Sequence, residues 1–119
     1  MRCPYYLRDG TATDAGTWAQ YFEGLDRQVA VTRVVDGALP ASSCVVSTVF
    51  VGLDMNFHDG PPLIFETMVF GPAGCMDGDQ WRWSTEAQAL AGHERIVIAV
   101  CEKLSTPLVL IGVEDPWHA

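Results

Sequence analysis

The sequence predicts an α+β fold, in which an antiparallel sheet of four to five strands carries two helices packed on one face as a two-layer sandwich. Short runs rich in β-branched and aromatic residues follow one another with short connections, which favours antiparallel pairing of neighbours. Two other segments have the apolar spacing of amphipathic helices. The chain has 119 residues, the size of one domain, and we expect a single domain over residues 1–119 in which about residues 107–119 form a C-terminal extension.

A short strand and a helix are predicted at the start of the chain. Residues 4–7 could form the strand, and the Asp9-Gly10 pair favours a turn after it. Asp14 is suited to cap the helix, because a carboxylate at this position accepts hydrogen bonds from the first backbone N–H groups. Three apolar side chains then recur at helical spacing and define a core-facing stripe: Trp18, Phe22 and Leu25.

The middle of the chain is predicted to hold the strands. Residues 28–35, QVAVTRVV, alternate as in a half-buried strand. Residues 44–51 and 63–70 are apolar on both faces, which is typical of strands in the middle of a sheet or at a subunit contact. Glu66 interrupts the second of these strands and needs a partner or an edge that faces water. Residues 81–83, WRW, could form a short further strand.

A second helix is predicted to begin after Thr85 and to run to about Leu104. Thr85 and Gln88 match the capping-box pattern T-x-x-Q. Gly92 lies inside this helix and costs about 1 kcal/mol relative to Ala, a cost that is either tolerated or required because neighbouring backbone comes close. The apolar residues 108–113 that follow could form a final strand or pack across the core.

The charge of the chain limits its partners. The formal net charge is -8 and the isoelectric point is near 4.5, so the surface repels nucleic-acid phosphates and we expect no direct nucleic-acid binding. An acidic surface favours solubility or attraction to a basic protein. The first ten residues, MRCPYYLRDG, lack the apolar region of a signal peptide, and no apolar run is long enough to cross a bilayer. We therefore expect a cytoplasmic protein with no membrane contact.

The four cysteines show no metal-binding spacing. None of Cys3, Cys44, Cys75 and Cys101 belongs to a C-x-x-C pair, so a zinc site is not expected. In a cytoplasmic protein we expect these residues to be reduced thiols in the core or near the surface.

The connection between the two central strands has a polar tip that could carry chemistry. Asp54, His58 and Asp59 are candidate metal ligands, although their spacing matches no known metal signature. The same carboxylates and Asn56 are also the residue types that turn and cap loops. We favour this structural role.

A catalytic set would combine the loop with two residues elsewhere. Asp54 and His58 could act as an acid and base pair together with Glu66 and His93. His93, however, follows the apolar stripe of the second helix, where a hydrogen-bonded core histidine is more common than a ligand. The chain has no Walker, dinucleotide or nucleophile-elbow motif, and no cofactor is expected.

Six short blocks occur in order along the chain: STVF, GLD, NF, GPPLIFETMVFG, ST and ALAGH, at residues 47–50, 52–54, 56–57, 60–71, 84–85 and 89–93. Together they resemble a small family encoded by bacteriophages and prophages, notably of actinobacteria. The family is uncharacterised, so the resemblance implies a phage origin and a location in the host cytoplasm but no activity. Its members usually carry His where this chain has Met55, which weakens a mechanism that needs a histidine there.

Three functions are open at this point. The first is a non-enzymatic phage accessory protein that binds a host or phage protein, which we favour because no catalytic set is recognisable. The second is a small hydrolase or metal-dependent enzyme. The third is a virion or assembly component, in which apolar strands form a subunit interface of a homo-oligomer.

Overall fold

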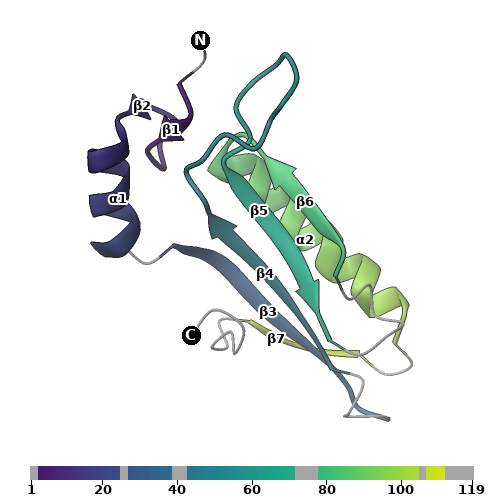
Figure 1. Ribbon diagram of the computed structural model, residues 1–119. Coiled ribbons are helices and arrows are strands. Elements are labelled where there is room, and N and C mark those ends of the chain that lie inside the picture. Colours follow the sequence, from purple (N-terminus) through teal and green to yellow (C-terminus); the bar gives the residue numbers. More distant parts are fainter. Residues whose placement is uncertain (1–2, 25–26, 39–42, 72–77, 105–106, 112–119) are drawn as a thin grey trace.

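The computed structural model contains one large sheet, one small sheet and two helices (Figure 1). It describes residues 3–24, 27–38, 43–71, 78–104 and 107–111. The elements in chain order are β1 (Tyr5–Tyr6), β2 (Ala12–Thr13), α1 (Ala15–Gly24), β3 (Gln28–Asp36), β4 (Cys44–Phe50), β5 (Phe65–Phe70), β6 (Gln80–Trp83), α2 (Glu86–Glu102) and β7 (Pro107–Ile111).

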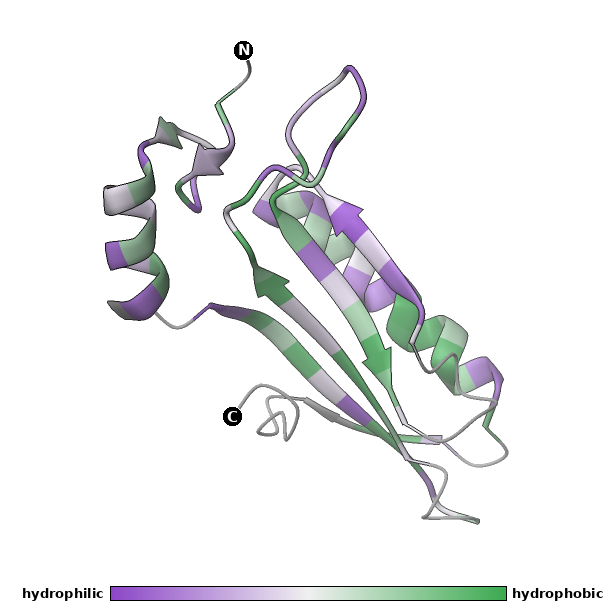
Figure 2. Cartoon of the chain, viewed as in Figure 1, coloured by the Kyte–Doolittle hydropathy of each residue, from purple (hydrophilic) through white to green (hydrophobic). Residues whose placement is uncertain are grey.

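The large sheet has five strands in the order β6-β5-β4-β3-β7, and all of its pairs are antiparallel. The α+β prediction, with four to five antiparallel strands and two helices, is confirmed. The apolar strand β4 lies at the centre, where strands with two apolar faces belong, and Figure 2 shows it mostly in the green of hydrophobic residues. Residues 107–111 form the final strand, paired with β3, whereas residues 112–113 of the predicted apolar run lie outside the described residues.

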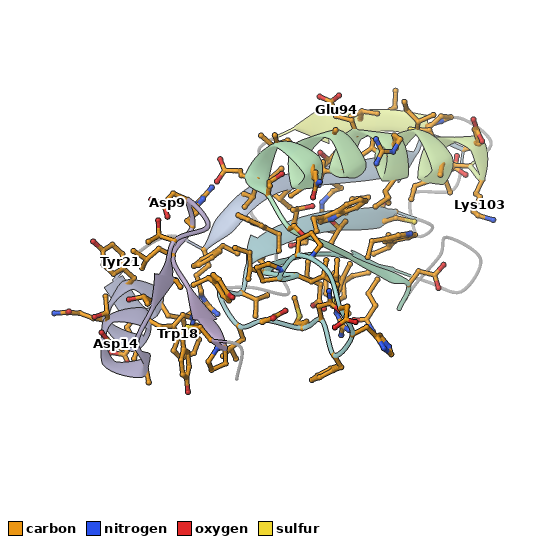
Figure 3. The ribbon with its side chains drawn as sticks, turned by 90° about the horizontal axis from the view of Figure 1, so that it is seen from above. Asp9, Asp14, Trp18, Tyr21, Glu94 and Lys103 are labelled. Carbon is orange, nitrogen blue, oxygen red and sulfur yellow. The ribbon has the colours of Figure 1, made fainter. Side chains whose placement is uncertain are left out.

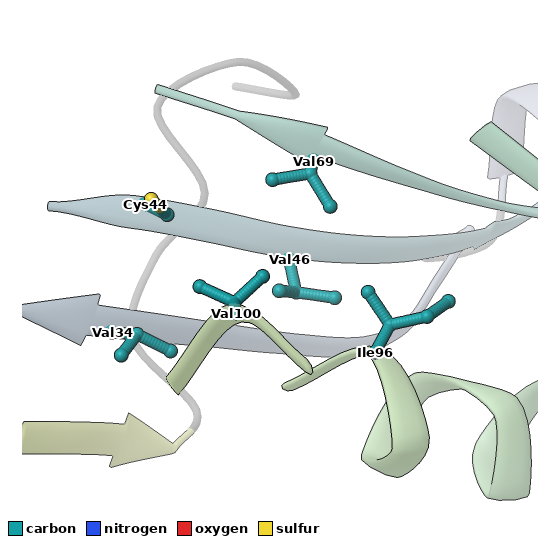
Figure 4. Packing of buried hydrophobic residues seen from close by; sticks show 6 residues of the cluster. All are labelled: Val34, Cys44, Val46, Val69, Ile96 and Val100. Carbon is teal, nitrogen blue, oxygen red and sulfur yellow. The ribbon is translucent and has the colours of Figure 1, made fainter. Parts of the chain in front are cut away.

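Helix α2 covers one face of the large sheet and contacts β3, β4, β5 and β6. Its buried side chains meet those of three strands in a cluster that Figure 4 shows from close by: Val34, Cys44, Val46, Val69, Ile96 and Val100. Burying each valine or isoleucine side chain stabilises the fold by about 1.5 to 3 kcal/mol. This cluster fixes the helix on the sheet.

The ends of both helices follow the predicted capping chemistry. Thr85 accepts a hydrogen bond from the backbone N–H of Gln88, and the Gln88 side chain accepts one from Thr85 N, which completes the predicted capping box. Asp14 Oδ1 accepts a hydrogen bond of 2.7 Å from Thr17 N, as predicted. Helix α2 ends at Glu102, two residues before the predicted Leu104, and Lys103 is its C-cap.

Helix α1 and the hairpin of β1 and β2 form a separate layer beside the end of β4 (Figure 1). Trp18 stacks on Phe22 with ring centroids 4.8 Å apart, and Trp18 Nε1 donates a hydrogen bond to Val51 O. Tyr21 lies on the side of α1 that faces away from the sheet (Figure 3). An ion pair between Arg8 and Glu86 joins the hairpin to the start of α2.

Cys44 differs from the expectation of reduced thiols. It is disulfide-bonded and fully buried, whereas Cys3 and Cys101 are free thiols. Cys75 lies outside the described residues. The expectation was wrong for Cys44, because it was drawn from the expected cytoplasmic location, and sequence spacing does not show which thiols the fold brings together.

The described part of the chain contains no helix that is both long and apolar enough to cross a membrane.

Candidate functional site

The loop between β4 and β5, residues 51–64, extends beyond the end of the sheet (Figure 1). Its two sides are held together by backbone hydrogen bonds. Val51 N donates to Ile64 O over 2.8 Å, and Met55 N donates to Leu63 O over 2.9 Å. The loop therefore begins as a continuation of the central hairpin, and only its tip is free of ladder pairing.

Two polar side chains shape the tip. Asp54 Oδ1 accepts hydrogen bonds from Asn56 N at 2.8 Å and from Leu63 N at 3.1 Å. Asn56 Oδ1 accepts one from His58 N at 2.9 Å, and Asn56 Nδ2 donates one to Pro61 O at 2.9 Å. These are the local turns that Asp and Asn form with nearby backbone. The interpretation that Asp54 and Asn56 turn the loop is confirmed.

The hairpin of β1 and β2 supports the loop from the side. Tyr6 N donates a hydrogen bond of 2.8 Å to Gly52 O, and Asp54 N donates one of 2.9 Å to Pro4 O. An isolated antiparallel bridge joins Tyr5 to Leu53 between these bonds. The base of the loop is therefore fixed by chain segments far apart in the sequence.

Gly52 allows α1 to reach the loop. Its φ of +73° is unfavourable for residues with a Cβ, and a Cβ at this position would lie 2.5 Å from Trp18 Nε1 and 2.8 Å from Phe50 Cζ. Only glycine leaves room for the Trp18 ring here.

Phe57 stands at the tip with 88% of its surface exposed. His58 and Asp59 beside it are also exposed, and residues 56–59 line an open surface depression. Phenylalanine is usually buried, so a nearly complete exposure on a hydrogen-bonded loop marks this residue as unusual.

His93 takes part in a buried network instead of a surface site. Its Nε2 lies 2.9 Å from Thr32 Oγ1, and its Nδ1 lies 2.7 Å from Thr48 Oγ1. Thr48 Oγ1 in turn lies 2.6 Å from Thr67 Oγ1, which accepts a hydrogen bond from Trp83 Nε1. His93 is 4% exposed, and burial lowers its pKa from 6.5 to about 4. The prediction of a hydrogen-bonded core histidine is confirmed.

The structure does not bring the predicted catalytic residues together. Thr67 points toward α2, so its neighbour Glu66 points to the opposite face of the sheet, away from His93. Glu66 there accepts a hydrogen bond of 3.3 Å from Arg82, which supplies the partner that a charged residue in a strand requires. Asp54 and His58 lie in the β4–β5 loop, outside the strand that holds Glu66 and the helix that holds His93. Among the described residues, no group of three or more His, Cys, Asp or Glu side chains is arranged to hold a metal ion.

Two features of these sites were not predicted from the sequence. Thr32, Thr48 and Thr67 lie on three different strands, and only the pairing of those strands joins their hydroxyls and His93 in one network, in which Thr67 bonds Thr48. The exposure of Phe57 was not predicted, because phenylalanine is usually buried. The sequence marked this residue only as part of the NF block.

The role of Asp54 as an acceptor can be tested by two substitutions. Asp54→Ala removes the oxygen that accepts two backbone N–H groups, and we expect the free energy of unfolding to fall by about 1 to 2 kcal/mol. Asp54→Asn keeps an acceptor oxygen and should stay within about 0.5 kcal/mol of the wild type. Urea unfolding measures both values. Equal losses in the two variants would show that the charge of Asp54, and not its acceptor geometry, matters.

Comparisons with protein-family models, with curated proteins and with solved structures find no match to this chain.

Proposed function

We propose that this protein acts by binding another protein through the tip of the β4–β5 loop, with Phe57 as the anchor. The observation that carries this proposal is the 88% exposure of Phe57 on a loop whose turns are hydrogen-bonded. Burying such a ring in a partner contributes about 1.5 to 3 kcal/mol. Because the loop is already ordered, little conformational entropy is lost on binding.

The surroundings of Phe57 indicate the chemistry of the partner. His58 and Asp59 are exposed beside it, and the whole chain carries a formal net charge of -8. An acidic protein associates fastest with a surface of opposite charge. The partner that fits best has an apolar pocket with a basic rim.

The resemblance to bacteriophage and prophage proteins motivates the setting of this interaction. We propose that the protein is a phage-encoded accessory protein that meets a host or phage protein. The enzyme alternative has less support, because Glu66 and His93 lie on opposite faces of the sheet and both have structural partners.

Replacing Phe57 should weaken binding without weakening the fold. We expect Phe57→Ala to lower the affinity for the partner at least about 30-fold, since the loss of a central aromatic anchor typically costs 2 kcal/mol or more. Its free energy of unfolding should change by less than about 0.5 kcal/mol, because the side chain is exposed. Affinity capture from an actinobacterial lysate, followed by titration of the captured protein, measures the affinity.

Tyr21→Ala is the matched control. Tyr21 is an aromatic residue that is 47% exposed on α1, and its replacement should leave capture unchanged. The proposal fails if every captured protein binds the Phe57→Ala variant as well as it binds the wild type.

A further inference from the structure

The two edges of the large sheet differ in their protection against pairing with another strand. The β6 edge is four residues long and carries the charged Arg82. The β7 edge, PLVLI, is uncharged over five residues. Charged and short edges discourage the addition of a further strand, whereas long apolar edges invite it. Strand β7 has one protective residue, Pro107 at its start, and lacks the charge that β6 carries.

Strand β7 exposes apolar side chains on both faces of the sheet. Leu108 is 55% exposed and Val109 is 44% exposed. Val109 pairs with Val34, which packs under α2, so neighbouring Leu108 points to the other face. In the described part of the chain, β3 is the only strand paired with β7. The outer side of β7 therefore presents backbone groups and apolar side chains together.

We infer that β7 is a dimerisation edge that pairs antiparallel with β7 of a second copy of this chain. The residues at its centre, Leu-Val-Leu at 108–110, read the same in both directions. A twofold axis through Val109 would set Val109 opposite Val109 and Leu108 opposite residue 110, so the edge is complementary to itself. The result is one continuous sheet of two five-stranded halves.

The charge of the chain limits where two copies can meet. Two copies with a net charge of -8 repel each other wherever their acidic surfaces meet. Strand β7 carries no charged residue, so pairing of two β7 strands brings no like charges of the strands themselves together. This inference does not depend on the role of Phe57, which lies in a different part of the chain.

Sedimentation equilibrium over a range of concentrations tests the inference. We expect a wild-type dimer with a Kd on the order of 10 µM, as for a small interface. Val109→Lys should weaken it at least about 100-fold, because each copy would place a charge at the twofold axis. Leu108→Lys, on the other face of the sheet, should weaken the dimer to a similar extent. It replaces Val109→Lys in the test if that variant does not fold. Exchange of the β7 amides that point away from β3 should slow as the wild-type concentration rises.

Tyr21→Lys, at an exposed aromatic on α1, is the matched control and should leave the Kd unchanged. A wild type that stays monomeric up to about 1 mM would overturn the inference. A dimer that survives both lysine substitutions in β7, or one that Phe57→Ala abolishes, would also overturn it. The inference would also be overturned if the β7 amides become protected against hydrogen exchange only when a different protein is added.

Discussion

Lowering the pH from 7 to 4 is expected to reduce the free energy of unfolding by about 3 kcal/mol through His93 alone. Burial lowers the pKa of His93 from 6.5 to about 4, so between these values the unfolded chain binds a proton that the native protein does not. Stability therefore rises with pH across this interval. The contribution is fully present above pH 6.5 and is lost as the pH falls toward 4. Urea unfolding at several pH values measures it.

His93→Gln removes this titration and is the variant to compare. The difference in unfolding free energy between wild type and His93→Gln should shrink as the pH falls from 6.5 to 4.5. If His93→Gln does not fold, an NMR titration of the His93 ring in the wild type replaces it. A ring that titrates near pH 6.5 would contradict the buried network.

Gly92→Ala is expected to lower the free energy of unfolding by about 2 to 3 kcal/mol, although alanine favours helices. A Cβ at Gly92 would lie 2.2 Å from Cζ2 and 2.3 Å from Cη2 of Trp83. The indole cannot move away freely, because its Nε1 donates a hydrogen bond of 3.0 Å to Thr67. The clash and the weakened hydrogen bond together outweigh the gain in helix propensity of about 1 kcal/mol.

Gly16→Ala is the matched control for this substitution. Gly16 is an exposed helical glycine in α1, and the nearest atom to a Cβ there is Asp14 Oδ1 at 3.4 Å. This variant should gain up to about 1 kcal/mol. The double variant Gly92→Ala with Trp83→Phe should recover part of the loss, since the smaller ring leaves room. Equal stability of Gly92→Ala and Gly16→Ala would refute the close contact.

Local patterns predicted most of the secondary structure. The alternation over residues 28–35 marks β3, and the Thr85 and Gln88 pair marks the start of α2. These signals depend on neighbours in the chain, so sequence carries them directly. β2 was not predicted, because a strand of two residues has no periodicity to read.

Long-range packing was harder to predict. The apolar stripe of α1 indicates that one side of the helix is buried, but it does not show what that side packs against. In the structure, Trp18 of α1 contacts the segment that follows β4 and the strand β1. The close contact at Gly92 comes from the Trp83 side chain, whereas the sequence left open a tolerated cost or an approaching backbone. Neither contact follows from spacing, because each joins segments that only the fold places together.

The candidate site shows the same division. Asp54 and Asn56 were interpreted as turn residues on their chemistry, which acts over a few positions. The exposure of Phe57 and the burial of His93 between α2 and the sheet depend on the tertiary structure. Sequence reasoning could name His93 as a core residue, but it could not separate it in space from Glu66.

Site-specific photo-crosslinking at position 57 tests most directly whether the loop tip is the binding site. A photoreactive phenylalanine derivative replaces Phe57 in one sample and Tyr21 in another. Each sample is mixed with lysate and irradiated. We predict a discrete crosslinked product from position 57 that position 21 does not give and that an excess of unmodified protein suppresses. Identical products from the two positions, or none from position 57, would contradict a role for Phe57 as the anchor.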